Sequence, residues 1–253
     1  MESQNIFKKL FFININKAMA FFLLVFALLG IFAIGWKETL PQVGIALATA
    51  ILLDIFFVYR KTKQIAMPYT AIITAFFVST ILIPGINWYI VFFATAAAIL
   101  SKHLLRVNGR HIFNPSAFGL VFAMLFFNAG NAWWSSVNRY LLIIFGLYFM
   151  YRLRTYFITI PYFLLTAVLV GIHHYTQGAA LLNTFIIINY FFMLFMLIEP
   201  KTVPFTKKGK VIYALIIAVV SFILFAYSIP KIDPALAALL VGNIAVPLLN
   251  KRR

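Results

Sequence analysis

A short run of polar and helix-breaking residues, Asn114-Pro115-Ser116-Ala117, lies between two apolar stretches of the chain. Asn or Ser is favoured at a helix N-cap and Pro is tolerated in the first turn, so this run predicts a helix start. A helix N-terminus offers free N–H groups and a partial positive charge, which suit an anion such as a phosphate or a ligand carbonyl. The alternative interpretation is an ordinary capped helix after a loop.

A second polar segment runs from Glu199 to Thr206 and reads Glu-Pro-Lys-Thr-Val-Pro-Phe-Thr. Its two prolines forbid a continued helix, so the preceding apolar stretch must end here. The hydroxyls of Thr202 and Thr206 could bond orphan backbone carbonyls or a ligand. The alternative is a rigid turn bracketed by lysines.

Asp54 is the acidic residue that lies well inside a predicted membrane crossing. Acids at membrane depth are costly, so Asp54 is a candidate for an ion pathway. It lies about two helical turns from Arg60 and Lys61, which leaves a structural ion pair or snorkelling at the interface as the alternative.

The four histidines, at positions 103, 111, 173 and 174, show no metal-ligand pattern with nearby carboxylates or thiolates, so we predict no metal site. The sequence also contains no Gly-x-Gly-x-x-Gly, Walker A or catalytic-triad arrangement. We therefore assign no catalytic residue.

Composition defines the elements that must position these residues. Of 253 residues 64% are hydrophobic and 10% are charged, whereas a soluble domain has about 45–50% and about 25%. No residue from Gln64 to Ser101 carries a formal charge, and this uncharged run is longer than the roughly 20 residues of one bilayer crossing. We predict a polytopic α-helical membrane protein whose first crossing, Ala18–Trp36, is retained, because it is longer than a signal peptide's apolar core.

The net charge of +16 would suggest nucleic acid in a soluble protein. In a membrane protein it instead reflects lysines and arginines concentrated in cytoplasmic loops, so we predict anionic lipids and not nucleic acid as partners. The chain has no cysteine, and therefore redox chemistry would need a bound organic cofactor or another subunit.

Ten apolar segments can be drawn. The sixth is too short to span upright, and it either extends back through Trp133 and Trp134 or forms a half-helix. With the N-terminus in the cytoplasm, 18 of the 21 Lys and Arg residues fall on the cytoplasmic side, and only Lys37, Arg139 and Lys231 on the other. This favours cytoplasmic N- and C-termini in the cell membrane and an even number of crossings. The segments are Ala18–Trp36, Pro41–Tyr59, Ile65–Ile83, Ile86–Ser101, Ile112–Trp134, Tyr140–Tyr151, Thr155–Ile172, Gln177–Ile198, Val211–Ser228 and Ala235–Asn250.

An internal repeat relates segments that lie five apart. The third segment leads into Ile83-Pro84-Gly85 and the eighth into Ile198-Glu199-Pro200. The fifth carries Asn114-Pro115, and the tenth carries Asn243 and Pro247. Five segments per half force opposite orientations, so we predict inverted repeats over residues 18–134 and 135–250, after an N-terminal cytoplasmic segment 1–17. The alternative is likeness through apolar composition alone.

Three motifs in this order resemble one family. The run from Arg110 to Leu120 resembles the Phe-Asn-Pro-Ala motif of the RnfD/NqrB family, the D subunit of the Rnf electron-transport complex and the B subunit of the sodium-translocating NADH:quinone reductase. The run from Glu199 to Tyr213 is similar to that family's Asp-Pro-x-(Ser/Thr)-x-Pro-x-Thr segment. The ending from Asn243 to Asn250 is similar to its Asn-x-x-x-Pro-x-x-(Asp/Asn) ending.

The resemblance implies a ten-helix inverted-repeat bundle related to urea transporters. It also implies a flavin-bearing subunit that passes electrons beside partner membrane subunits, coupled to Na⁺ or H⁺ movement. The family usually carries a Ser-Gly-Ala-Thr-type loop whose threonine holds FMN covalently, but no threonine lies between Phe118 and Arg154 here, and Ser135 and Ser136 are poor substitutes. We therefore expect any flavin, FMN or riboflavin, to be non-covalent, held by Asn114–Ala117 and by Glu199, Thr202 and Thr206.

Three functions follow from these observations. The first is a flavoprotein membrane subunit of an Rnf/Nqr-like complex, at most one part of a redox-driven, ion-translocating oxidoreductase (a translocase). The second is a small-solute channel or transporter of the urea-transporter type, with a pore lined by neutral hydrogen-bonding groups. The third is a scaffold subunit without a cofactor.

Overall fold

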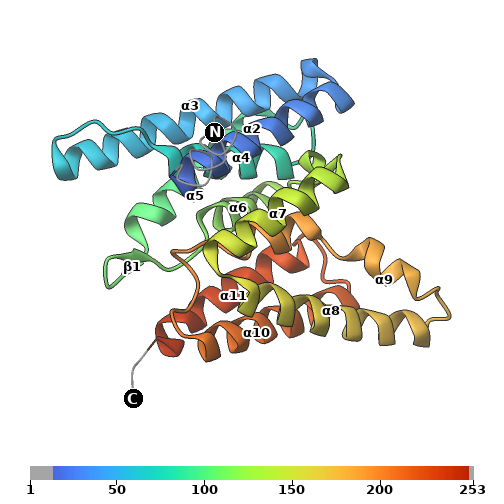
Figure 1. Ribbon diagram of the computed structural model, residues 1–253. Coiled ribbons are helices and arrows are strands. Elements are labelled where there is room, and N and C mark those ends of the chain that lie inside the picture. Colours follow the sequence, from blue (N-terminus) through green and yellow to red (C-terminus); the bar gives the residue numbers. More distant parts are fainter. Residues whose placement is uncertain (1–13, 251–253) are drawn as a thin grey trace, which may run out of the picture.

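Helices form nearly all the regular structure of residues 14–250, the part of the chain that the computed structural model describes (Figure 1). Most of the predicted segment 1–17 lies outside this part. The first half holds α2 (Ile15–Ile34), α3 (Trp36–Thr62), α4 (Tyr69–Ile81), α5 (Trp88–Leu104), the antiparallel strands β1 (Arg106–Val107) and β2 (Arg110–His111), and α6 (Pro115–Phe127). The 3-10 turn η1 (Trp134–Ser136) leads to α7 (Arg139–Leu153), α8 (Tyr156–Thr176), α9 (Leu182–Ile187), the π-helical turn η2 (Phe192–Met196), α10 (Lys207–Ala226) and α11 (Pro234–Leu249).

Among the described helices, α2, α3, α8 and α10 are long and apolar enough to cross a membrane. Of the four shorter apolar helices, α4, α5 and α6 lie between α3 and α8 in the sequence, and α11 follows α10. The prediction of an all-α polytopic membrane protein is therefore confirmed.

Several predicted segments are helical over only part of their length. The third segment is helical only in α4, since Pro68 precedes it and Leu82 is already extended. The fifth ends at Asn128, which adopts a left-handed conformation with φ 53°. The eighth is broken, because α9 is six residues long and its end at Ile188 is extended before the chain resumes as η2. The sixth, α7, has 15 residues, about 22 Å, which is less than the hydrocarbon core.

The two halves repeat one packing pattern in opposite directions. In the first half α3 packs on α4 and α5, and α5 packs on α6; in the second half α8 packs on η2 and α10, and α10 packs on α11. The chain in α3 runs toward the end that carries the β1–β2 hairpin, while the chain in α8 runs away from it (Figure 1). This is the arrangement of two inverted five-segment units.

The structure corrects the residue match within the repeat. We predicted that Asn243 and Pro247 are the counterparts of Asn114 and Pro115. Instead, α6 begins with Asn114 as N-cap and Pro115 at the first position, and α11 begins in the same way with Asp233 and Pro234. Asn243 and Pro247 lie inside α11. The prediction paired the segments by the residue types Asn and Pro. A helix start instead needs a capping side chain before the proline, and Asp caps as well as Asn.

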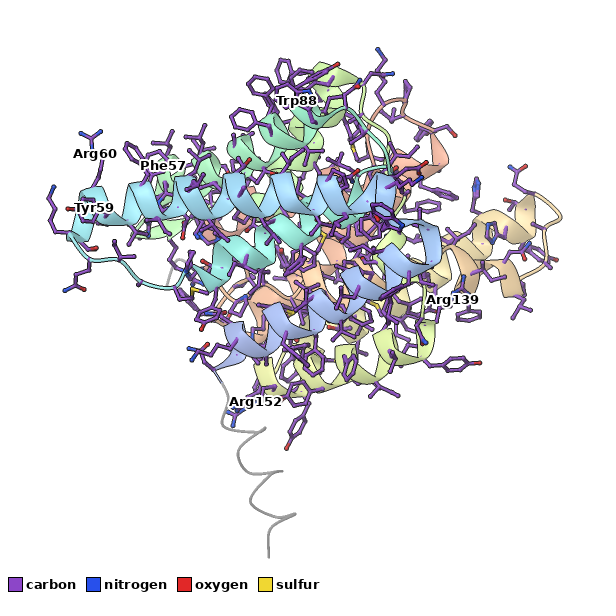
Figure 2. The ribbon with its side chains drawn as sticks, turned by 90° about the horizontal axis from the view of Figure 1, so that it is seen from above. Phe57, Tyr59, Arg60, Trp88, Arg139 and Arg152 are labelled. Atoms are coloured by element: carbon purple, nitrogen blue, oxygen red, sulfur yellow. The ribbon has the colours of Figure 1, made fainter. Side chains whose placement is uncertain are left out.

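We call the end of the bundle that holds the hairpin and the turn at 199–206 the basic end. Here Phe205 N–H donates to Asn250 Oδ1 (2.9 Å), and Lys210 Nζ donates to the Arg154 carbonyl (3.3 Å). At the opposite end Ile83 N–H donates to the Gly130 carbonyl (3.1 Å). Figure 2 shows Arg60 at one extremity of the molecule and Arg139 toward the other.

Two close contacts fix the packing of the helices. A Cβ on Gly119 would collide with the Ala94 carbonyl oxygen, so glycine lets α6 lie directly on the backbone of α5. A Cβ on Gly30 would collide with the ring of Trp134, which is buried and donates through Nε1 to the Leu82 carbonyl (3.1 Å). The segment between α6 and α7 is thereby held against α2 and α4.

Candidate functional site

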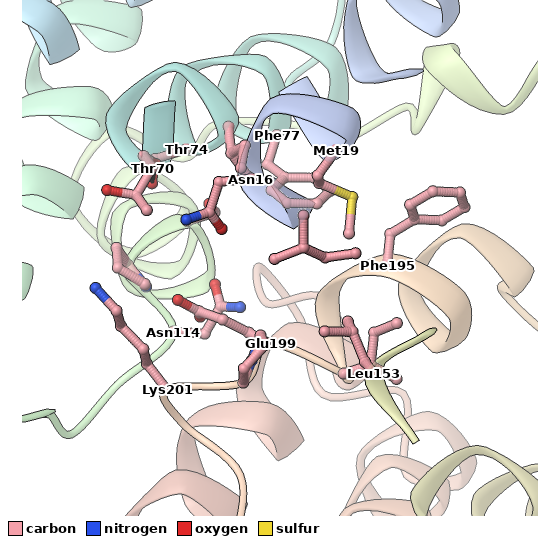
Figure 3. A pocket seen from close by; sticks show the side chains of 16 residues that line it. Asn16, Met19, Thr70, Thr74, Phe77, Asn114, Leu153, Phe195, Glu199 and Lys201 are labelled. Atoms are coloured by element: carbon pink, nitrogen blue, oxygen red, sulfur yellow. Dashed lines mark hydrogen bonds between the residues drawn. The ribbon is translucent and has the colours of Figure 1, made fainter. Parts of the chain in front are cut away.

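A cavity of about 250 Å³ opens between the two halves at the basic end. Its walls come from α2, α4, the start of α6, the end of α7, η2 and the first part of the turn at 199–206. One side is polar and the other apolar, as Figure 3 shows. The polar side holds Thr70, Asn16, Asn114, Glu199 and Lys201, and the apolar side holds Met19, Phe77, Phe195 and Leu153.

Part of the residue set predicted from the sequence lines this cavity: Asn114, Pro115, Ser116 and Glu199. Ala117 is fully buried inside the start of α6. Thr202 faces a second cavity on the turn. Thr206 is the N-cap of α10 and accepts the N–H of Gly209 at 3.0 Å.

The start of α6 offers fewer free donors than the sequence suggested. Pro115 has no N–H, and Ala117 N–H donates to Asn114 Oδ1 at 3.0 Å. Of the first three residues of the helix, Ser116 is the one left to offer a backbone N–H to a ligand. The cap itself is neutral, so the partial positive charge of the helix end is kept beside the cavity.

Asn114 and Asn243 also tie the two halves together, and we call this pair the amide tie. Asn114 N–H donates to Asn243 Oδ1 (2.8 Å), and Asn114 Nδ2 donates to the Met196 carbonyl (3.3 Å). Asn243 Nδ2 donates to Tyr213 Oη (3.0 Å) and to the Thr202 carbonyl (3.3 Å). Both asparagines are buried, so these bonds form without competition from water.

The hairpin holds the turn at 199–206 in place. His111 Nε2 lies 3.0 Å from Glu199 Oε1, and Arg110 Nη2 donates to the Pro200 carbonyl at 2.5 Å. Thr202 Oγ1 donates to the Glu199 carbonyl at 3.3 Å. The carboxylate of Glu199 is therefore fixed between the imidazole of His111 and the cavity.

Asp54 is buried in an ion pair on the other side of the cavity. Its Oδ1 accepts Lys102 Nζ at 2.8 Å and lies 2.7 Å from His103 Nε2. The partners thus come from α5 and not from Arg60 or Lys61, which follow Asp54 on its own helix. Lys102 Nζ also donates to Thr70 Oγ1 (2.7 Å), so the pair reaches the cavity wall.

The sequence reasoning missed Lys102. It was counted among the cytoplasmic loop charges, yet it is buried in the last turn of α5. A buried lysine needs an acidic partner, and Asp54 is the acidic residue on the helices of the first half that could serve from inside the bundle. That pairing was the available signal.

The segment that would carry a covalent flavin in the family lies at the opposite end. Ser135 is 1% exposed, and Ser136 Oγ donates to the Trp133 carbonyl at 2.7 Å. Ser135 is therefore enclosed beside Trp134, which packs over Gly30, whereas Ser136 lines a cavity at this end.

The fold and the cavity together define a class: a polytopic helical membrane protein of two inverted halves with a cavity where a broken-helix start meets a turn. A family match narrows this class further. Residues 12–140 match the NQR2, RnfD, RnfE family, about half of the chain, and the chain belongs to this family. It is in general terms a membrane subunit of an Rnf/Nqr-type complex, and such complexes contain other membrane subunits. No curated protein matches the chain.

Proposed function

We propose that the chain is a flavin-binding subunit of an ion-translocating electron-transport complex and holds a non-covalent FMN or riboflavin in the cavity beside Asn114. Family membership supports the class of complex. The observation that carries the flavin is the two-sided cavity, in which aromatic and aliphatic side chains face a row of hydrogen-bonding groups.

The residues present fit the flat ring of a flavin, which has apolar faces and a polar edge. Phe77 and Phe195 offer rings against its faces, while Ser116 and Asn16 offer donors and acceptors to its edge. The cavity of about 250 Å³ lies just below the usual range for small-molecule sites, roughly 300–1,000 Å³. When bound, the flavin supplies electron transfer, which the side chains of this cysteine-free protein do not.

The charges around the cavity suit a polarised or anionic ligand edge. Lys201 lines the cavity, and Lys102 reaches its wall through Thr70. Glu199 brings a negative charge, but His111 lies 3.0 Å behind it. The N-terminus of α6 adds a partial positive charge to this side, because its cap, Asn114, is neutral.

Asp54 is our proposed ion-pathway residue. Its chain of contacts through Lys102 to Thr70 links the interior of α3 to the cavity, so a cation or proton at Asp54 would respond to charge there. The pair with Lys102 equally serves as a structural contact, and the two roles are separated by the double variant described below.

The basic end is proposed to face the cytoplasm in the cell membrane. Lys37, Arg139 and Lys231 are the Lys and Arg residues that the described part of the chain places toward the opposite end. The positive-inside rule then orients both termini to the cytoplasm, and anionic lipids would surround the basic end.

The channel and scaffold hypotheses predict a protein without a chromophore. A channel needs free hydrogen-bonding groups along its path. The side chains of Asn114 and Asn243 instead form hydrogen bonds within the protein, to each other's residues and to Met196, Thr202 and Tyr213. We therefore retain the flavin subunit as the function that the geometry supports best.

The test is a visible absorbance spectrum of the purified, detergent-solubilised protein, repeated after acid precipitation. Flavin bands in the supernatant support a non-covalent flavin. Bands that stay in the pellet would mean covalent attachment and contradict the non-covalent site. A folded protein with no flavin bands would favour the channel or the scaffold.

A further inference from the structure

A second cavity of about 250 Å³ lies at the basic end between the hairpin, the turn at 199–206 and the last turn of α11. Lys201 lines both this cavity and the cavity beside Asn114 that we propose holds the flavin. We call the second one the hairpin pocket. Its chemistry is set by Arg110, Lys201, Phe205 and Asn250.

Arg110 is positioned with one nitrogen unused. Its Nη2 donates to the Pro200 carbonyl, and its guanidinium lies 4.4 Å from the centre of the Phe205 ring. Its Nη1 is buried and has no hydrogen-bond partner among residues 14–250. A buried charged donor without a hydrogen-bond partner is unfavourable. The guanidinium of Arg110 therefore brings a fixed positive charge to the lining of the hairpin pocket.

The charge around Arg110 favours an anion. Lys201 takes part in none of the ion pairs of the described residues. Burial lowers the pKa of Arg110, the nearby carboxylate of Glu199 partly opposes this, and an arginine stays charged at neutral pH. The carboxylate of Glu199 and the last carbonyls of α11, which carry roughly half a negative charge, oppose an anion, and the two cations together exceed them.

Two further features describe the acceptor. Asn250 Oδ1 accepts Phe205 N–H, which leaves its amide nitrogen to donate. Phe205 and Val107 are exposed apolar side chains at the rim. An arginine fork, a lysine and an amide are the groups that recognise phosphate oxygens, and apolar neighbours suit the glycerol and acyl part of a lipid.

We propose that the hairpin pocket binds a phosphate group, carried either by an anionic phospholipid or by a soluble phosphate compound. The site does not depend on a flavin in the neighbouring cavity. In this proposal Arg110 and Lys201 bind a phosphate ligand at the basic end that is separate from the flavin.

The experiment measures the unfolding temperature of the detergent-purified full chain against increasing phosphatidylglycerol, phosphatidylcholine or inorganic phosphate. Arg110→Gln removes the unpaired donor, and Lys201→Gln removes a cation without touching the contact between hairpin and turn. Arg106→Gln is the matched control, because it removes the same charge from the same hairpin. Among residues 14–250, Arg106 bonds to the Gly109 carbonyl within the hairpin, and it does not line the pocket.

Phosphatidylglycerol should stabilise the wild-type protein and the Arg106 variant more than phosphatidylcholine does. Its affinity should fall about tenfold or more in Arg110→Gln, since one charge-assisted hydrogen bond is worth roughly 1.5–3 kcal/mol and each 1.4 kcal/mol is tenfold. Lys201→Gln should also lower the affinity for phosphatidylglycerol. If Arg110→Gln does not fold, the result for Lys201→Gln tests the proposal.

The three ligands separate the sources of the phosphate. Stabilisation by phosphatidylglycerol without inorganic phosphate identifies a lipid headgroup site, and stabilisation by inorganic phosphate identifies a soluble phosphate compound as a ligand. Equal effects of phosphatidylglycerol and phosphatidylcholine, with no effect of phosphate, would overturn the proposal. So would wild-type affinity in both Arg110→Gln and Lys201→Gln. Loss or presence of flavin absorbance in the same samples reports on the flavin proposal separately.

Discussion

The two inverted halves start their last helices with the same device, yet the two starts have different surroundings. At α11, Asp233 Oδ1 accepts the N–H groups of Ala235 (2.9 Å) and Leu236 (3.0 Å). Its Oδ2 accepts Trp133 Nε1 at 3.0 Å and Asn131 Nδ2. A full negative charge therefore meets the positive end of α11, and the carboxylate is satisfied by the protein itself.

At α6 the cap is the neutral amide of Asn114, and the helix end borders the cavity. Its partial positive charge is not cancelled by the cap, and Lys201 lies beside it. The difference of one side chain, amide against carboxylate, separates a helix end that can accept a ligand from one that is already neutralised. An inverted repeat thus supplies two equivalent helix ends, and in our proposal the capping residues decide which one binds the ligand.

The largest effect is expected from breaking the ion pair at the basic end with Asp54→Asn. This leaves the buried charge of Lys102 without a carboxylate, which should cost about 3–5 kcal/mol of unfolding free energy. Denaturant unfolding in detergent micelles measures it. The double variant Asp54→Asn, Lys102→Gln should recover more than half of the loss, and no recovery would contradict the pairing.

The same double variant sharpens the role of Asp54. If Asp54 carries ions, the refolded double variant should lose Na⁺ or H⁺ uptake when the complex is reconstituted in vesicles, although its stability is restored. Uptake at the wild-type rate would leave the residue with a structural role only.

The next effect is expected at the amide tie. Asn243→Leu leaves the Asn114 N–H, the Thr202 carbonyl and Tyr213 Oη without this partner, at about 1–3 kcal/mol for each buried group. Asn87→Leu, at an exposed position, is the control and should stay within about 0.5 kcal/mol. Equal small losses in both variants would mean that the tie contributes nothing.

A smaller effect is expected at the opposite end. Asp233→Ala removes the cap of α11 and should cost about 1–2 kcal/mol. Thermal unfolding in detergent would show it, and the flavin content per folded chain should not change. Flavin loss in this variant would place the ligand at the wrong end of the molecule for our account.

The smallest effect is expected at Thr206. Thr206→Ala removes the cap of α10 at about 1 kcal/mol, and flavin binding should persist because the hydroxyl bonds Gly209 and does not line the cavity. Absorbance of the purified variant measures the bound flavin. Loss of flavin at unchanged stability would restore Thr206 to the ligand site predicted from the sequence.

Local signals in the sequence predicted the class of fold and the cap of α6. The apolar segments gave the crossings, and Asn114-Pro115 gave a helix start because capping depends on adjacent residues. The turn at 199–206 was predicted from its prolines, and the structure places its first residue, Glu199, in the same cavity as Asn114.

Contacts between distant segments could not be predicted in this way. Asp54 finds its partner 48 residues away on α5, and Asn114 finds Asn243 on α11, which depends on how the helices pack. The break between α9 and η2 was hidden by an apolar composition that suits both a helix and an irregular turn. The domain limits at 17 and 134 remain predictions.

The most direct measurement is the flavin content per folded chain of the reciprocal pair Asn114→Asp and Asp233→Asn. Asn114→Ser serves as the variant that keeps a neutral cap. We predict that Asp233→Asn and Asn114→Ser retain the flavin, whereas Asn114→Asp loses it, because a carboxylate would cancel the helix charge and stand against the Met196 carbonyl. Equal flavin in both members of the pair, or loss in Asp233→Asn alone, would contradict the assignment of the site to α6.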